Sequence, residues 1–194
     1  MTTQDLTAGS TELRLIDFAN LRWVAAALAV MGLAMVSGNL WFLNFVHVLA
    51  GLMWTGIDLF MGFVLGPVLR RLDLSARRQL TTRLMPRMIF LMPTLSVITG
   101  TAGWWLAEKL GYFDLGYPEF FWVVAALVVI TLLTVQGLGV LLPTNVRICL
   151  EMQKEQPDPQ KMHVWMRRYL RATAFQGMMQ VGIIIIMARF VSGL

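Results

Sequence analysis

Five long apolar segments dominate this chain and limit what it can fold into. Of its 194 residues, 57% are apolar and only 14% are charged, and the mean hydropathy is +0.66. A helix that spans a bilayer needs about 20 mostly apolar residues. The segments that approach or exceed this length are 23–38, 40–68, 86–107, 120–142 and 170–191. We therefore predict an all-α fold, an integral membrane helical bundle of about five transmembrane helices.

The apolar segments leave little room for a separate soluble domain. We predict a polar N-terminal segment at 1–22 and a single transmembrane helical domain at 23–194. The polar segment has neither the basic start nor the small-residue cleavage site of a signal peptide, so we expect the chain to keep it. Segment 23–38 is uncharged and rich in small residues. We expect it to form an extra N-terminal helix beside a four-helix core.

The basic residues of the chain gather in two connections, although its formal net charge is +5. They are Arg70, Arg71, Arg77, Arg78, Arg83 and Arg87 around one connection, and Arg147, Lys154, Lys161, Arg167, Arg168 and Arg171 around the other. Because Lys and Arg favour short cytoplasmic loops, we expect both connections and the N-terminus to be cytoplasmic. A multi-pass protein of a bacterial-type inner membrane, in contact with anionic lipid, explains this charge without nucleic acid.

His47 is one of two histidines, and it lies inside the apolar run WFLNFVHVLAGLMWTGIDLFMGFVLGPVLRRL. Ionisable groups inside a membrane are costly, so they usually face the interior of a bundle and mark a functional site. Residues at steps of four and three share one helix face with His47. They are Gly51, Trp54, Asp58, Gly62 and Leu65.

This face predicts a haem b site with His47 as the metal ligand. Histidine is a common axial ligand of haem iron, and glycines such as Gly51 allow a flat macrocycle to approach the backbone beside Trp54. Tight helix packing is the alternative explanation for the glycines, because small residues are common where membrane helices meet. We also place Gly100, from the small face Ser96, Gly100 and Gly103, at the cofactor site.

Two cations are expected near the outer end of the bundle, at the level of His47. Lys109 and Arg189 are positioned to pair with haem propionates, since charge-assisted contacts between a cation and a carboxylate are strong. The alternative for both is that the charged end simply reaches the interface while the stem stays in lipid.

Several other polar residues lie inside the predicted spans. Asp58 is roughly 16 Å from His47 along the helix axis, and it serves either as a proton relay or as a partner of Arg87. The last span carries the polar stripe Tyr169, Thr173, Gln176 and Gln180, which either bonds another helix or lines a cofactor or quinol pocket. The fourth span carries Thr131, Thr134 and Gln136, which we expect to hydrogen-bond between helices, and then a proline that ends it.

Three stretches of the chain resemble a group of small haem-associated membrane proteins. FVHVLAGLMWTGIDLFMGFVLGPVLRRL is similar to the histidine helix of HemJ-type protoporphyrinogen oxidases, PuuD-type membrane domains and CopD-type copper-resistance domains. RLMPRMIFLMPTLSVITGTAGWWL looks like their following helix, and RRYLRATAFQGMMQVGIIIIMARF resembles the HemJ-type closing helix. The resemblance implies a helical bundle that binds haem b, with His47 and Lys109 at the positions important in the HemJ-type pattern. Phe175-Gln176 stands where that pattern has an Asn-Glu pair.

Three hypotheses for the function follow. The first is a haem-b membrane redox protein that transfers electrons to a redox partner or another membrane subunit, or that oxidises a tetrapyrrole. The second is a CopD-like copper-handling protein that uses His47 with the thioethers of Met85, Met88 and Met92. The third is a cofactor-free subunit that anchors or assembles a larger complex. GFVLG at 62–66 has the glycine spacing of helix dimers, which leaves a homodimer open.

Overall fold

The structure is a computed structural model that describes residues 19–154 and 156–192. Within these ranges the chain is helical almost throughout and contains no strand. Five helices are long and apolar enough to cross a membrane, namely Ala19–Val36, Leu40–Arg71, Leu74–Lys109, Phe120–Met152 and Pro159–Val191. The all-helical fold with five candidate spans is therefore confirmed, and the chain is described below as a multi-pass membrane protein.

Two of the five spans contain a π-helical turn, which the sequence analysis did not predict. The first span is α1 (Ala19–Val36), and the second consists of α2 (Leu40–Leu59), the π-helix η1 (Phe60–Leu65) and α3 (Gly66–Arg71). The third span is α4 (Leu74–Lys109), which the 3-10 turn η2 (Tyr112–Asp114) follows. The fourth consists of α5 (Phe120–Gln136), the π-helix η3 (Gly137–Leu141) and α6 (Leu142–Met152), and the fifth is α7 (Pro159–Val191). Each π-helical turn comes directly before a Gly-Pro or Leu-Pro step, where the proline N–H is missing.

The helices extend beyond the expected apolar segments. The first span already includes Ala19, α4 begins at Leu74 rather than at 86, and α7 begins at Pro159 rather than at 170. The proline exit expected for the fourth span is wrong. Pro143 lies in the first turn of α6 and the helix continues to Met152, because a proline at that position needs no intrahelical N–H bond.

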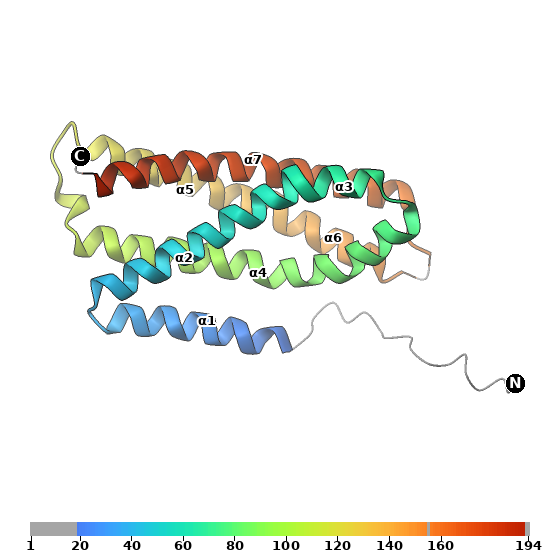
Figure 1. Cartoon of the computed structure of the whole chain (residues 1–194), viewed down its shortest axis with the longest axis horizontal. Coiled ribbons are helices and arrows are strands. Elements are labelled where there is room, and N and C mark those ends of the chain that lie inside the picture. Colours follow the sequence, from blue (N-terminus) through green and yellow to red (C-terminus); the bar gives the residue numbers. More distant parts are fainter. Residues whose placement is uncertain (1–18, 155, 193–194) are drawn as a thin grey trace, which may run out of the picture.

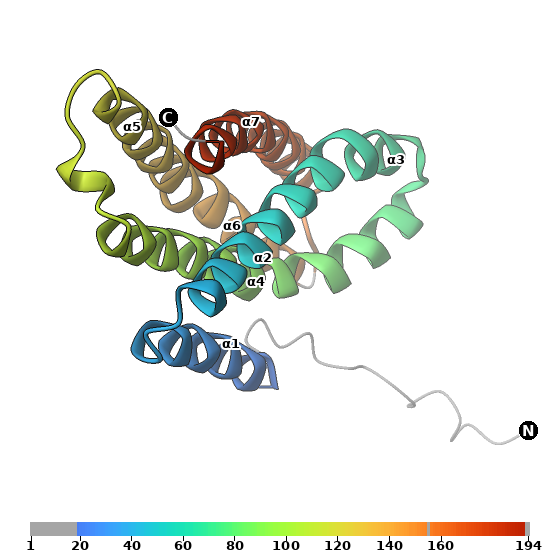
Figure 2. The same cartoon turned by 60° about the vertical axis from the view of Figure 1, so that its left-hand side comes forward.

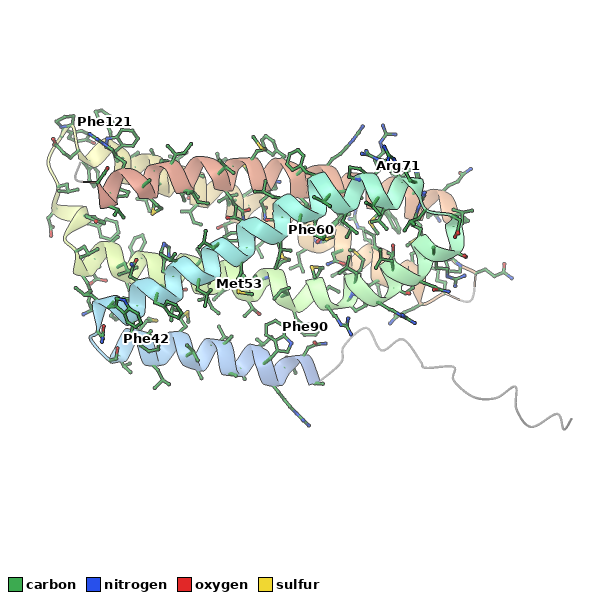
Figure 3. The ribbon with its side chains drawn as sticks, in the orientation of Figure 1. Phe42, Met53, Phe60, Arg71, Phe90 and Phe121 are labelled. Carbon is green, nitrogen blue, oxygen red and sulfur yellow. The ribbon has the colours of Figure 1, made fainter. Side chains whose placement is uncertain are left out.

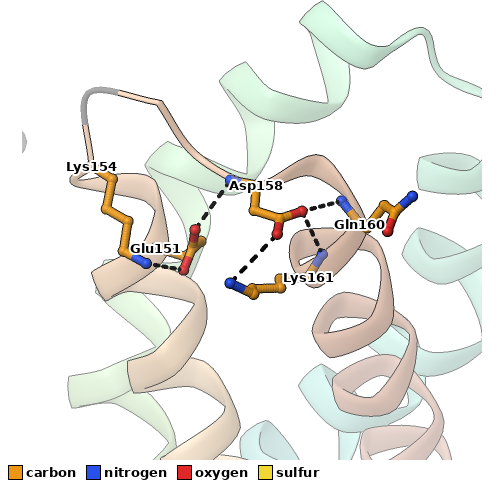
Figure 4. A network of polar contacts seen from close by, with 5 residues as sticks. All are labelled: Glu151, Lys154, Asp158, Gln160 and Lys161. Carbon is orange, nitrogen blue, oxygen red and sulfur yellow. Dashed lines mark hydrogen bonds and ion pairs between the residues drawn. The ribbon is translucent and has the colours of Figure 1, made fainter.

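Polar caps explain where the extended helices begin at the arginine-rich end. Asp73 accepts a hydrogen bond from the Ala76 N–H at 2.7 Å and so caps α4. Asp158 caps α7 in the same way, and its hydrogen bonds from the backbone lower the pKa of its carboxyl group. The connection between α6 and α7 is closed by Glu151, which accepts from the Asp158 N–H and pairs with Lys154 at 2.7 Å (Figure 4).

The four spans after α1 surround a common interior, and α2 crosses it diagonally. Figure 1 shows α2 running from α4 toward α7 as it proceeds from its N-terminal end to the arginine-rich end of the bundle, with α5 and α6 behind. Helix α1 packs only on the outside of α2 and α4 (Figure 2). Ala34 is its one fully buried residue among those described. The first helix is thus peripheral to the other four, as its composition suggests.

The outer surface of the bundle is apolar. Side chains such as Met53, Phe60 and Phe121 project away from the helices (Figure 3), and these three are between 46% and 62% exposed. Soluble monomers rarely expose apolar surface on this scale. Exposure of this kind along all five spans is what contact with lipid chains requires.

Helices α2 and α7 meet through glycine contacts that leave no room for a larger residue. A Cβ on Gly62 would lie 2.5 Å from both Cα and Cβ of Ala174, and a Cβ on Gly177 would lie 2.8 Å from Leu59 Cδ2. By contrast, a Cβ on Gly56 would meet nothing within 4 Å. Gly62 in η1 and Gly177 in α7 therefore let the second span approach α7 at backbone distance, whereas Gly56 has no part in this contact.

We expect Gly62→Ala to destabilise the bundle by about 1–3 kcal/mol, the usual cost of overpacking. The backbone of Ala174 must move to accept the new methyl group. Thermal unfolding in mild detergent measures the effect, with Gly56→Ala on the same span as the matched control. Equal transition temperatures for the two variants would contradict the contact.

Candidate functional site

His47 lies where α2 meets α4, and its imidazole ring is held in one orientation. Nδ1 is 2.9 Å from the backbone carbonyl oxygen of Thr99. A carbonyl oxygen only accepts, so Nδ1 carries the hydrogen; in the neutral ring, which apolar surroundings favour, Nε2 then keeps its lone pair. The ring is packed so closely on Gly103 that a Cβ there would lie 2.7 Å from Cε1. A glycine on α4 thus makes room for the histidine of α2.

Gly51 belongs to the same contact between α2 and α4. A Cβ at Gly51 would lie 3.3 Å from Cγ2 of Thr99. Thr99 therefore contacts Gly51 with its side chain and His47 with its carbonyl group. Gly51 therefore takes part in helix packing, which is the alternative explanation that the sequence left open for the glycines.

A cleft of about 460 Å³ lies on another face of α4, between α4, α5, η3, α6 and α7. Its apolar walls include Trp54, Trp104 and Trp105, and Gly100 leaves open space beside the backbone. Ser96, Thr101, Thr134, Asn145, Tyr169 and Gln176 supply polar groups. A mainly apolar cleft of this size with a few convergent polar groups is typical of sites for small organic ligands.

The residues assigned to one cofactor site fall into three places. His47 and Gly51 lie at the α2–α4 contact, whereas Trp54 and Gly100 are walls of the cleft. Lys109 and Arg189 lie near the C-terminal ends of α4 and α7, over the rings of Trp105 and Trp122 at 5.7 Å and 5.9 Å. The ring of Trp105 therefore connects Lys109 to the cleft, but His47 is not among the cleft walls.

Asp58 is fully buried and bonds α7 rather than Arg87. The Gln176 amide donates to Oδ2 of Asp58 at 3.0 Å. Gln180 faces the same carboxyl group from the next turn of α7. The polar stripe on α7 thus has both roles considered from the sequence, because Gln176 bonds another helix and also lines the cleft.

The π-helical turn η3 brings a second amide to α7. Gln136, directly before η3, donates from Nε2 to the backbone carbonyl of Ala172 at 2.7 Å. This confirms the interhelical role expected for Gln136. The expectation was wrong for Thr131 and Thr134, since their hydroxyl groups donate to Leu127 and Ile130 in the same helix. Hydroxyl groups with short side chains reach the preceding turn more easily than a neighbouring helix.

The other candidate ligands do not gather around His47. His163 is exposed at the start of α7, as expected. Met88 and Met92 line the cleft, and Met92 is eleven residues from Gly103 on α4, roughly 16 Å along the axis. In the described part of the chain, no three His, Cys, Asp or Glu residues stand close enough to hold a metal ion. Within those described residues His47 is thus not part of a cluster of three or more such ligands.

A wider cleft of about 990 Å³ opens at the arginine-rich end, between α3, the start of α4 and the start of α7. The basic residues that line it are Arg70, Arg77, Arg78, His163, Arg167 and Arg171, and no acidic residue among those that the structure describes does so. Arg77 is already engaged, because its guanidinium donates to the carbonyl groups of Leu69, Arg70 and Leu72. A basic cleft between membrane helices suits the headgroups of anionic lipids.

No match to this chain was found among models of known protein families, curated proteins or solved structures. The resemblance to haem-associated proteins therefore rests on its short motifs alone. Inferences about the function therefore depend on the contacts of His47 and Asp58.

We expect Gly103→Ala to break the hydrogen bond between His47 and Thr99, because the new Cβ needs the space of the imidazole. In protein labelled with [15N]histidine and carrying His163→Ala, the parent spectrum should show one neutral tautomer with hydrogen on Nδ1. The Gly103→Ala spectrum should show a mixture of tautomers. Gly56→Ala, which fills open space on α2, should leave the spectrum unchanged, and an unchanged spectrum in Gly103→Ala would contradict the packing.

Proposed function

We propose that this protein is a haem-b-binding membrane redox protein, with His47 as the axial ligand. The observation that carries the proposal is the state of the His47 ring. Its Nδ1–H is donated to a backbone carbonyl at 2.9 Å, which is the arrangement that orients histidines that bind metals through Nε2. Gly103 holds the ring in that orientation by leaving it space.

The donor chemistry of the site fits haem better than a free metal ion. A free ion needs three or four protein ligands, but haem iron has four ring nitrogens and needs only an axial donor from the protein. Haem supplies one-electron redox chemistry whose potential depends on the axial ligand and on the dryness of the site. His47 would hold the iron, Thr99 would fix the tautomer, and the apolar spans would exclude water.

The cleft on the other face of α4 is the proposed site of an apolar redox substrate, a quinol or a tetrapyrrole. Three tryptophans provide flat surfaces, and Gly100 leaves room beside the backbone. Tyr169 and Gln176 provide a hydroxyl and an amide for orientation. Lys109, over Trp105, is placed to meet an acidic group at the outer end. Electrons would then pass across α4 to a membrane or soluble redox partner.

Copper handling is less well supported by the arrangement. That function needs His47 and the methionine thioethers in one site, and these groups lie in different places along α4. A cofactor-free anchor would explain the helix contacts, but it gives the Nε2 donor atom of His47 no chemical role. The three hypotheses differ in metal content, so a direct measurement separates them.

The proposed location is a bacterial-type inner membrane, with the N-terminus in the cytoplasm. Most of the arginines lie at one end of the bundle, and Asp73, Asp158 and the basic cleft lie at the same end. His47, Lys109 and Arg189 then lie toward the outer side. By the preference of Arg and Lys for cytoplasmic loops, the redox site would be close to the periplasmic surface.

The test is to purify the protein in mild detergent after expression with sufficient haem, and to record oxidised and dithionite-reduced absorption spectra. Wild type should show a Soret band and sharp reduced α and β bands. In His47→Ala the haem content should fall by about 10-fold or more, since even loss of an outer partner of a ligand costs that much.

His163→Ala is the matched control, because it removes the other histidine from an exposed position. It should retain the wild-type spectrum and haem content. A featureless wild-type spectrum would contradict the proposal, with metal analysis then finding copper or no metal. Equal haem content in all three proteins would contradict the role of His47.

A further inference from the structure

The interior of the bundle holds a carboxyl group that has no cationic partner. Asp58 is 0% exposed and lies between apolar turns of α2. The ion pairs in the described part of the chain are Lys154–Glu151 and Lys161–Asp158, and neither involves Asp58. An unpaired carboxylate in hydrocarbon is so costly that the group must be neutralised, either by a proton or by another bound cation.

The atoms around Asp58 are neutral oxygens and amides that lack partners. Oδ2 of Asp58 accepts from Gln176, but Oδ1 has no hydrogen-bond partner. Oε1 of Gln176 is also unpaired, and so are both amide atoms of Gln180. Gln176 and Gln180 are only 2% and 1% exposed. Buried polar groups are nearly always paired, so an unpaired carboxyl oxygen beside two buried glutamines with unpaired amide atoms indicates a ligand.

The surrounding helices add no charge that would replace such a ligand. The titratable side chain of α7 that interacts electrostatically with Asp58 is Tyr169, which is buried and neutral in its ordinary state. Cys149 of α6 lies beyond Tyr169 and is also buried. Thr173 donates its hydroxyl to the Tyr169 carbonyl and carries no charge. The site therefore has one negative charge at most, which suits a monovalent cation.

We propose that Asp58, Gln176 and Gln180 form a binding site for a small monovalent cation, a proton or Na⁺. The Asp58 carboxyl group supplies the charge. Gln176 presents its amide nitrogen to Oδ2 in this structure, and rotation of either glutamine amide would present an oxygen, a neutral ligand of the kind that hard cations prefer. Gln176 also lines the 460 Å³ cleft, so it connects the Asp58 site to that cleft. This site does not depend on haem and is separate from His47.

The experiment uses dicyclohexylcarbodiimide, an apolar reagent that adds to protonated carboxyl groups inside membrane proteins and leaves a stable N-acylurea. The full-length protein in detergent is labelled over a range of pH, in NaCl and in choline chloride of equal ionic strength. Peptide mass mapping then locates the adduct. We expect a single dominant adduct on Asp58, with labelling that falls several-fold as the pH rises.

The salt distinguishes the two cations. If NaCl but not choline chloride suppresses the labelling several-fold, the site binds Na⁺; if only pH changes the labelling, it binds a proton. Absence of an adduct on Asp58 at every pH would overturn the proposal, and so would labelling that depends on neither pH nor NaCl.

Two variants of α7 test the role of the amides without removing the carboxyl group. Gln180→Leu keeps the volume but removes a ligand, so it should weaken Na⁺ protection or shift the pH at which labelling is half complete. Met178→Leu is the matched control, because Met178 is 55% exposed on the lipid-facing side of the same helix. Identical labelling curves for the two variants would overturn the role of Gln180.

Discussion

The structure depends on how α2 places its polar side chains in a medium without water. Inside a bilayer every polar group must find a partner within the protein. The polar face of α2 carries His47 and Asp58 roughly 16 Å apart along the axis, and no single neighbouring helix serves both. The diagonal path of α2 solves this problem, since its N-terminal half meets α4 at Thr99 and its C-terminal half meets α7 at Gln176. Glycines allow both contacts at backbone distance, with Gly103 beneath His47 and Gly62 against Ala174.

The two π-helical turns bring their helices into contact with the same stretch of α7, at Ala172 and Ala174. Gly62 of η1 packs on Ala174, and Gln136 just before η3 donates to Ala172. Each turn comes just before a proline, which removes a backbone donor and loosens the regular hydrogen-bond pattern. Wider turns of this kind are frequent at functional sites. Here they lie beside Gln176, the residue that joins the Asp58 site to the cleft.

The sequence was sufficient for the spans, the peripheral first helix and the choice of His47 and Asp58 as unusual residues. These features follow from composition and from helical spacing within one segment. It did not show that His47 and Trp54, on the same helix face, contribute to different places, because that depends on the crossing of α2 over α4. Nor did it show that the amides of Gln176 and Gln180 face Asp58, which requires the register between α2 and α7. Packing between helices sets both, and a single sequence contains little information about it.

Three chemical features lie along one bundle: a fixed imidazole near the start of α2, an apolar cleft along α4, and a buried carboxyl group deeper inside. The proposed function requires that His47 is an iron ligand. The chain contains only two histidines, so the most direct measurement is pulsed electron paramagnetic resonance of ferric protein labelled with [15N]histidine in a His163→Ala background. If His47 binds the iron, the spectrum will show a strong 15N hyperfine coupling from one directly bound imidazole nitrogen. A haem-loaded protein without that coupling would contradict the role of His47.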